Sequence, residues 1–140
     1  MKYGQKVTVM EKGLYLLATK GFIGDSPDGI VHTTKGERRL LEIKCPWKWK
    51  HKTVTEACKS RDFYCFMENG ELQLKTSHKN YTQIQGLMAI CNLQKCDFVI
   101  YTLRDIKIIE IEFNIAFWNT LLPKLEQFYL TSVIPKLFQK

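Results

Sequence analysis

The amino-acid sequence predicts a layered α/β or α+β domain, in which a mixed β-sheet carries helices on its faces. Two patterns lead to this prediction. Short runs of apolar and β-branched residues, separated by turn residues, indicate several strands. Residues 80–92 and 115–129 instead carry apolar side chains at helical spacing, which indicates two helices. No repeat, linker or low-complexity tract interrupts the 140 residues, so we expect a single domain over residues 1–140.

Short strands dominate the first half of the chain. They are predicted at residues 7–9, 14–19, 29–33, 38–45, 64–67 and 72–74. Lys12-Gly13 is the expected turn between the first two strands, and residues 34–36 close a hairpin between the next two. Asn69-Gly70 is a two-residue hairpin signal between the last two. Residues 54–59 are predicted to form a short helix, capped by Thr53 or Thr55.

The second half of the chain alternates between helices and strands. In the helix predicted over residues 80–92, the apolar side chains that share one face are Ile84, Leu87, Met88 and Cys91. Strands are expected at residues 98–103 and 107–113, joined by a turn at Arg104-Asp105. The helix over residues 115–129 contains Pro123, which should kink it, and residues 134–140 begin a further helical turn.

Two short signatures carry the chemistry. The first is the turn Gly24-Asp25-Ser26-Pro27-Asp28-Gly29, and the second is the strand Leu41-Glu42-Ile43-Lys44-Cys45-Pro46. Because alternate side chains of a strand share a face, Glu42 and Lys44 should point together toward Asp28. By the same alternation, Leu41 and Ile43 are expected to point into a core.

That arrangement predicts a metal-dependent nuclease site. Two carboxylates can hold a hard cation such as Mg²⁺ and leave positions open for water and a phosphate oxygen. A lysine beside them can orient or deprotonate the attacking water and offset charge on the phosphate. Each signature alone also fits an ordinary turn or an exposed pair on an antiparallel strand, and it is their combination that favours the site.

The charge of the chain favours a polyanionic partner. Its 21 basic and 14 acidic residues give a formal net charge of +7. Basic residues cluster directly after the proposed catalytic strand, where Lys48, Lys50 and Lys52 are the expected nucleic-acid contacts. Trp47 and Trp49 lie between them and fit two readings equally, as core residues or as platforms for frayed bases.

The cysteines favour a reducing, intracellular compartment, either nucleus or cytoplasm. Their number is odd, and their spacing matches neither a disulfide framework nor a tight zinc pair, so most are expected to be small buried hydrophobic residues. They are Cys45, Cys58, Cys65, Cys91 and Cys96. No run reaches the ~18 apolar residues of a membrane span, and the N-terminus lacks a signal-peptide pattern, so no membrane contact is expected.

Five motifs together resemble a known family. In order they are GFIGDSPDGIV, LLEIKCPW, DFYC, NGELQLKTSHKNYTQIQGLMAI and CDFVIYT. The chain is similar, over roughly residues 7–135, to the YqaJ-type viral recombinase family, the lambda-exonuclease branch of the PD-(D/E)xK nucleases.

This resemblance implies a restriction-endonuclease-like mixed sheet flanked by helices, and a two-metal phosphodiesterase. Asp28 and Glu42 would be metal ligands together with the backbone carbonyl of Ile43, and Lys44 would be the catalytic lysine. Gln83 matches the family glutamine that supports the active site. Gln85 completes the same Gln-x-Gln motif, with a less defined role.

The N-terminus departs from the family pattern. Family members carry a helix before the first core strand, and a Gly-x-x-x-Glu motif on it supplies a further glutamate to the metal site. Here residues 2–6 resemble the start of that segment, but the strand predicted at residues 7–9 follows directly. Glu11 lies too close to a strand start and to Gly13 to be a confident replacement. The chain is therefore a truncated member, or takes the carboxylate from another chain, or has a weakened site that prefers Mn²⁺ to Mg²⁺.

The leading expectation is a Mg²⁺- or Mn²⁺-dependent deoxyribonuclease, an exonuclease acting at duplex DNA ends or single-stranded tails in recombination or repair. The alternative is a catalytically impaired nuclease-like module that binds DNA without cutting it. A third reading is an assembly subunit that forms homo-oligomers, because related exonucleases form rings around DNA.

Overall fold

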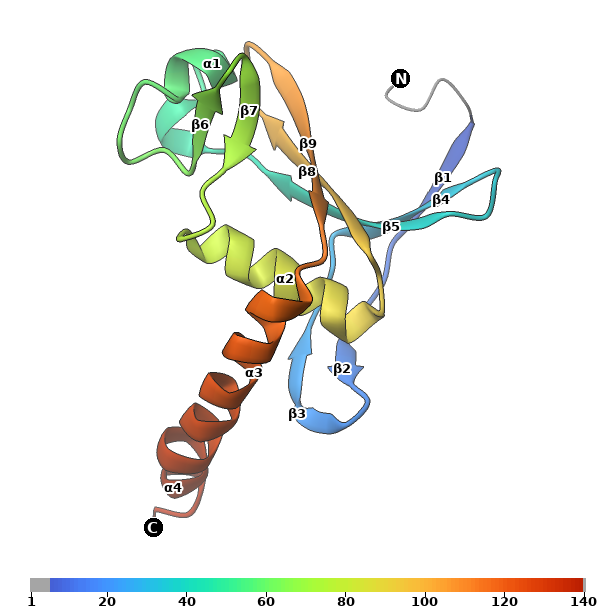
Figure 1. Ribbon diagram of the computed structural model, residues 1–140, viewed down its shortest axis with the longest axis vertical. Helices are drawn as coiled ribbons and strands as arrows, with labels where there is room; N and C mark the ends of the chain where they lie inside the picture. Colours follow the sequence, from blue (N-terminus) through green and yellow to red (C-terminus); the bar gives the residue numbers. More distant parts are fainter. Residues whose placement is uncertain (1–5, 140) are drawn as a thin grey trace.

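A five-stranded mixed sheet forms the centre of the protein, and the computed structural model describes residues 6–139 around it (Figure 1). The strands stand in the order β1 (Val7–Met10), β4 (Gly29–Thr33), β5 (Arg38–Lys44), β8 (Lys95–Tyr101) and β9 (Ile106–Glu112). Two separate hairpins are formed by β2 (Tyr15–Leu17) with β3 (Lys20–Asp25), and by β6 (Cys65–Glu68) with β7 (Glu71–Leu74). The predicted mixed α/β architecture is confirmed.

Four α-helices and two irregular turns complete the described chain. The helices are α1 (Val54–Ala57), α2 (Lys79–Cys91), α3 (Ile115–Phe128) and α4 (Ile134–Leu137). A 3₁₀ turn, η1 (Trp47–Trp49), follows β5, and a π turn, η2 (Tyr129–Val133), joins α3 to α4. The helix α3 continues through Pro123. None of the helices in residues 6–139 is long and apolar enough to cross a membrane.

β5 lies at the middle of the sheet. It pairs antiparallel with β4, in a register that ends at Gly29 and Leu41, and parallel with β8, in a register that runs from Leu40–Cys96 to Lys44–Ile100. Parallel neighbours need a long crossover, which here contains η1, α1, the β6–β7 hairpin and α2. The crossover therefore returns the chain so that α2 lies against the strand that carries the second signature.

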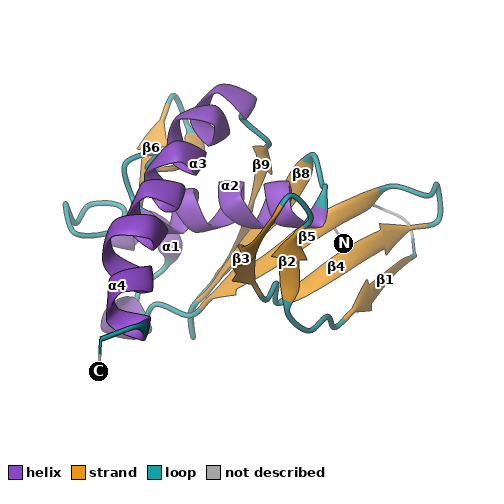
Figure 2. Ribbon diagram, turned by 90° about the horizontal axis from the view of Figure 1, so that it is seen from below, coloured by secondary structure: helices purple, strands orange, loops and turns teal. Residues whose placement is uncertain are grey.

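α2 covers one face of the sheet. It contacts β5 and β8, and α3 packs against it (Figure 2). Its predicted apolar stripe is confirmed, since Ile84, Leu87 and Met88 are fully buried in one core cluster with residues of the sheet. The sheet residues of that cluster include Ile30, Leu40, Cys96, Phe98 and Ile100.

One prediction about β5 is wrong. Ile43 was expected to point into the core, yet it is 43% exposed, while Glu42 is 1% exposed and shares its face with the buried Leu40. The reason is that α2 covers the Glu42 side of the sheet, and no described element covers Ile43 to the same extent. The proposed catalytic carboxylate thus lies on the buried face.

The pairing at the N-terminal end also differs from the prediction. β1 does not pair with the next strand around Lys12-Gly13; it pairs with β4, with Val9 opposite Val31. The next two strands form their own hairpin, which turns at Ala18-Thr19. A sequence run shows where a strand lies but not its partner, because strand pairing is a non-local choice.

Several local predictions are confirmed. Asn69 and Gly70 both have positive φ, at 50° and 80°, as the tight β6–β7 turn requires. Thr53 caps α1 and forms a reciprocal capping box with Glu56. Three of the five cysteines are buried and belong to the core cluster: Cys65, Cys91 and Cys96.

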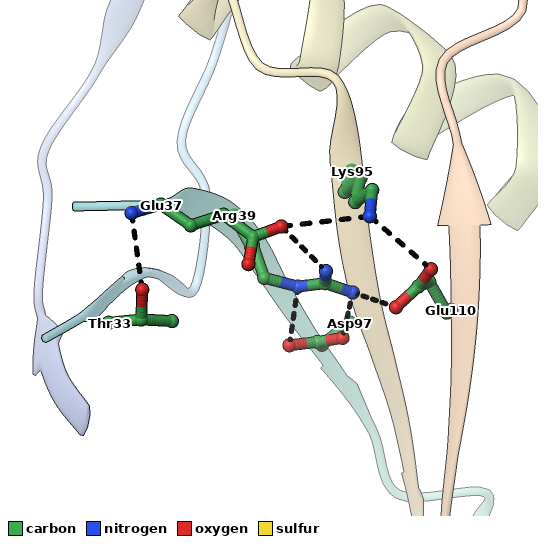
Figure 3. A network of polar contacts seen from close by, with 6 residues as sticks. All are labelled: Thr33, Glu37, Arg39, Lys95, Asp97 and Glu110. Carbon is green, nitrogen blue, oxygen red and sulfur yellow. Dashed lines mark hydrogen bonds and ion pairs between the residues drawn. The ribbon is translucent and has the colours of Figure 1, made fainter. Parts of the chain in front are cut away.

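A buried ionic cluster joins three strands on the face opposite α2 (Figure 3). Arg39 of β5 is 2% exposed and binds Asp97 of β8 through two nitrogens, Nε–Oδ2 at 3.2 Å and Nη2–Oδ1 at 2.8 Å. It also contacts Glu110 of β9 and Glu37. Lys95 lies 3.7 Å from Glu37 and 3.8 Å from Glu110, which spreads the charge over the cluster. The guanidinium thus links the strands on which the register of β5 depends.

Replacing Arg39 by Ala should lower the free energy of unfolding by roughly 3–5 kcal/mol, because the buried Asp97 carboxylate would lose the guanidinium that pairs with it through two nitrogens. Urea denaturation of both proteins measures the difference. Arg38→Ala is the matched control, since Arg38 is the exposed neighbour on the same strand and should change stability by no more than about 0.5 kcal/mol. An equal effect of the two substitutions would contradict the importance of the cluster.

Candidate metal and active site

Asp28 is tied directly to the strand β5. Its Oδ2 accepts a hydrogen bond of 2.7 Å from the backbone N–H of Ile43. The backbone ladder between β4 and β5 ends at the Gly29–Leu41 pair, so the Asp28 side chain provides the acceptor for the next free N–H of β5. The turn and the strand predicted from the two signatures therefore meet, and Asp28 comes next to Glu42.

Glu42 is a buried carboxylate with one oxygen left without a hydrogen-bond partner. Its Oε2 lies 3.3 Å from the Lys44 ammonium, whereas Oε1 is buried and has no partner among the described residues. Buried polar atoms are normally satisfied, and an unpaired carboxylate oxygen is costly. Oε1 is thus available to an added cation.

The surroundings of Glu42 favour its neutral form. Burial raises its pKa above the ordinary value, and the nearby negative charge of Asp28 raises it further. The ammonium of Lys44 and a backbone hydrogen bond from Asp28 oppose these effects but do not cancel them. Two carboxylates that repel each other in this way form a site that a divalent cation would stabilise.

Gln83 extends the site along α2. Lys44 Nζ donates a hydrogen bond of 3.2 Å to Gln83 Oε1, and Gln83 Nε2 donates one of 3.4 Å to Asp25 Oδ2. The structure therefore brings together four of the predicted site residues, Asp28, Glu42, Lys44 and Gln83. Asp25 was not predicted as a member, although its place three residues before Asp28 in the first signature could have indicated it.

Gln85, the second glutamine of the motif, points elsewhere. It is fully buried, donates through Nε2 to the carbonyl of Glu112 at 2.9 Å, and accepts at Oε1 from the N–H of Asn114 at 2.7 Å. Two residues along a helix differ by about 200°, so Gln83 and Gln85 cannot serve the same side. Gln85 fastens α2 to the end of β9 and the start of α3.

The donor set fits a hard divalent cation. Asp28 and Glu42 offer carboxylate oxygens, one of them unpaired, and the carbonyl of Ile43 stays the predicted third oxygen ligand. Within residues 6–139, no group of three or more His, Cys, Asp or Glu side chains is arranged to hold a metal. Residues 2–5, which resemble the start of the family helix, lie outside the described residues, and Glu11 is exposed between β1 and β2.

The basic run after β5 has partners of its own. Lys48 forms an exposed ion pair with Asp62 at 2.9 Å, and Lys50 Nζ lies 3.1 Å from the ring centroid of Trp47. Of the two readings predicted for the tryptophans, Trp49 fits the core residue and Trp47 fits the exposed platform. Trp49 packs against the core through an edge contact with Phe63. Trp47 is 78% exposed. Both belong to η1, a 3₁₀ turn that the sequence did not predict. Of the two rings, that of Trp47 is the exposed one, and Lys50 lies over one of its faces.

His78 also has a structural role that the sequence did not indicate. It caps α2, and its Nδ1 accepts a hydrogen bond of 3.1 Å from the N–H of Asn80. Desolvation lowers the pKa of His78, and the positive charges of Lys79 and Lys75 lower it further, which favours the neutral ring that this cap requires.

Comparison with known proteins adds a family and a structural relative. The sequence model of the YqaJ-like viral recombinase domain matches residues 1–94. The crystal structure of LHK-Exo in complex with dAMP is 30% identical to the chain with a TM-score of 0.59, and that of the alkaline exonuclease LHK-Exo from Laribacter hongkongensis is 30% identical with a TM-score of 0.58. Each similarity covers 94% of this chain, whereas the family model ends at residue 94 and so matches less of the chain than the predicted residues 7–135. No curated protein sequence matches the chain. The chain spans 64% of the length of these exonuclease structures.

Glu42→Gln should stabilise the metal-free protein at neutral pH. Because the folded-state pKa of Glu42 is raised above 4.5, the wild type loses stability as the pH rises through that folded pKa, and the amide does not. The difference between the two melting temperatures should therefore grow with pH in chelator-treated buffer. Glu68→Gln, which alters an exposed carboxylate, is the control and should show no such trend.

Added Mg²⁺ or Mn²⁺ should make the wild type more stable than Glu42→Gln. Metal at about 100 times its Kd stabilises the folded wild type by about 2.7 kcal/mol, and Glu42→Gln should gain little because it lacks a charged ligand. Differential scanning calorimetry with and without metal measures both effects. Equal stabilisation of the variant and the wild type would exclude Glu42 as a ligand.

Proposed function

Because the chain belongs to the family of YqaJ-like viral recombinase domains, we propose that it is a metal-dependent nuclease that hydrolyses phosphodiester bonds at DNA ends. The observation that carries the proposal is the buried Glu42, with its unpaired Oε1, beside Asp28 and Lys44. The structural relative LHK-Exo is an alkaline exonuclease whose crystal structure holds dAMP, which supports exonuclease chemistry here.

Each residue of the site would have a separate role in hydrolysis. Asp28 and Glu42, with the carbonyl of Ile43, would hold a divalent cation, Mg²⁺ or Mn²⁺, which supplies positive charge to the scissile phosphate. Lys44 Nζ lies 3.3 Å from Glu42 Oε2. As the ammonium it can orient the attacking water and donate to a phosphate oxygen, and as the neutral amine it can accept a proton from that water. Gln83 accepts from the Lys44 ammonium at 3.2 Å and so restricts where that group points.

The proposed partner and cellular compartment follow from the net charge of the chain and from its cysteines. A net charge of +7 favours DNA as the partner, and the basic run after β5 adjoins the end of the catalytic strand. Free cysteines, three of them in the core, fit a reducing compartment such as the nucleus or cytoplasm. Participation in DNA recombination or repair, and assembly into a homo-oligomer, belong to the same proposal.

The first test is hydrolysis of an end-labelled duplex with and without divalent metal. Asp28→Ala and Glu42→Ala should each abolish product while leaving the fold intact, because each removes a proposed metal ligand. Lys44→Ala should lower kcat roughly 10²–10³-fold with little change in DNA affinity, since its contribution is to the transition state. Lys124→Ala, at an exposed lysine of α3, is the control and should cut at the wild-type rate.

Two outcomes would change this assignment. Wild-type cutting by either carboxylate variant would exclude the proposed metal site. Tight binding of DNA by the wild type without any metal-dependent product would favour the alternative, a nuclease-like module that grips DNA without cutting it.

A second test addresses the basic run. Replacing Lys48, Lys50 and Lys52 together by Ala should weaken DNA binding uniformly across sequences. Each lost phosphate contact changes the slope of log affinity against log salt by about 0.9, so the slope should flatten by about 2 to 3 units. The control Lys35→Ala/Lys124→Ala/Lys136→Ala removes the same charge from exposed positions elsewhere and should keep the slope. An unchanged slope in the first variant would place the DNA path elsewhere.

A further inference from the structure

A basic hollow lies apart from the candidate active site. It has a volume of about 450 Å³ and is lined by His51, Lys52, Glu56, Lys59, Ser60 and Arg104. These residues come from three places in the chain: the segment after η1, the α1 region and the turn between β8 and β9. Lys52 was predicted from the sequence as a nucleic-acid contact. Residues 51–60 supply five members of the lining, and folding adds Arg104 from the β8–β9 turn.

Two hydrogen bonds hold the walls of the hollow together. The N–H of Leu103 donates to the carbonyl of Lys50 at 2.9 Å, and the N–H of Val54 donates to Asp105 Oδ2 at 3.2 Å. They fasten the β8–β9 turn to the segment that leads into α1, on both sides of Arg104 and Lys52. The segments that carry the cations are therefore joined by one backbone hydrogen bond and one bond to the Asp105 carboxylate, and not by contacts among the cations.

The positive charges in the hollow are poorly compensated. Lys52, Lys59 and Arg104 form no ion pair with any carboxylate in residues 6–139. Glu56 is the one acidic group in the lining, and its Oε2 already accepts a hydrogen bond of 2.7 Å from the N–H of Thr53. The pKa of Glu56 is lowered first by hydrogen bonds with Thr53 and then by the charges of Arg104 and Lys59, which line the same hollow.

We propose that this hollow binds the phosphodiester backbone of the DNA duplex. The inference rests on the proposed nuclease function and extends its DNA contacts beyond the basic run. Two lysines and an arginine around an open hollow suit a phosphate, because the Arg104 guanidinium and the Ser60 hydroxyl can also donate to its oxygens. Mutual repulsion of the cations is relieved when a phosphate binds, and the counterions released from DNA favour binding.

The position of the hollow favours DNA over a small anion. Residues 45–52 lead from Lys44 at the end of β5 through η1 to the hollow, and the exposed Lys48 and the half-buried Lys50 lie along that segment. A single small anion would use only the hollow, whereas a duplex can bridge it and the neighbouring cations. The β5 end and the α1 region adjoin in the fold (Figure 1).

The test is DNA affinity against salt, measured by fluorescence anisotropy in chelator so that no strand is cut. Lys59→Ala/Arg104→Ala should flatten the slope of log affinity against log salt by about 2 units, at about 0.9 for each phosphate contact. The control Lys124→Ala/Lys136→Ala removes the same charge from α3 and α4 and should leave the slope unchanged. Equal slopes for the two variants would overturn the inference, and circular dichroism confirms that both are folded.

A second measurement identifies the ligand without any variant. In heteronuclear NMR spectra of the wild type, a short duplex should shift the amide signals of Ser60 and Arg104. Shifts caused by inorganic phosphate but not by duplex would overturn the inference in favour of a small-anion site. Failure of the nuclease function itself has a separate signature, the absence of metal-dependent product from wild-type protein, so the two failures are distinguishable.

Discussion

The pairing of β5 with strands of opposite direction on its two sides is the constraint on which the rest of the structure depends. Its antiparallel register with β4 sets where Asp28 meets Ile43, and its parallel pairing with β8 requires the crossover that contains α2. The first half of the strand is held by the Arg39 cluster on one face, and the second half carries Glu42 and Lys44 on the other. A one-residue shift of β5 would exchange the two faces and bury the wrong charges.

The charged side chains on the two faces of β5 differ in how far they are neutralised by partners. Around Arg39, a buried guanidinium is matched by three carboxylates and a second cation, so the cluster can stabilise the sheet. Around Glu42, two carboxylates lie close together and one buried oxygen has no partner. Unrelieved repulsion of this kind costs stability in the metal-free protein and is typical of sites that bind a ligand. The Arg39 cluster thus stabilises the strand that also carries the less stable site around Glu42.

A third arrangement of charge, in the hollow near α1, lies between these extremes. Its cations are exposed, so water keeps their repulsion small. One backbone hydrogen bond and one bond to the Asp105 carboxylate, rather than ion pairs, hold together the segments that carry them. Such a surface gains most from a polyanion that is itself heavily charged. The site near Glu42 and the hollow therefore suit different parts of one substrate: the phosphate to be cut and the backbone that positions it.

Local chemistry explains what the sequence determined by itself. The alternation of a strand put Glu42 and Lys44 on one face, and helical spacing identified the buried stripe of α2. Both periods depend only on neighbouring residues. Non-local contacts decided the rest: β1 paired with β4, and α2 covered Glu42 rather than Ile43. Folding also joined Arg39 to Asp97, 58 residues away, and placed Arg104 beside Lys59. These contacts depend on which surfaces meet in the folded chain, and no local period encodes that choice.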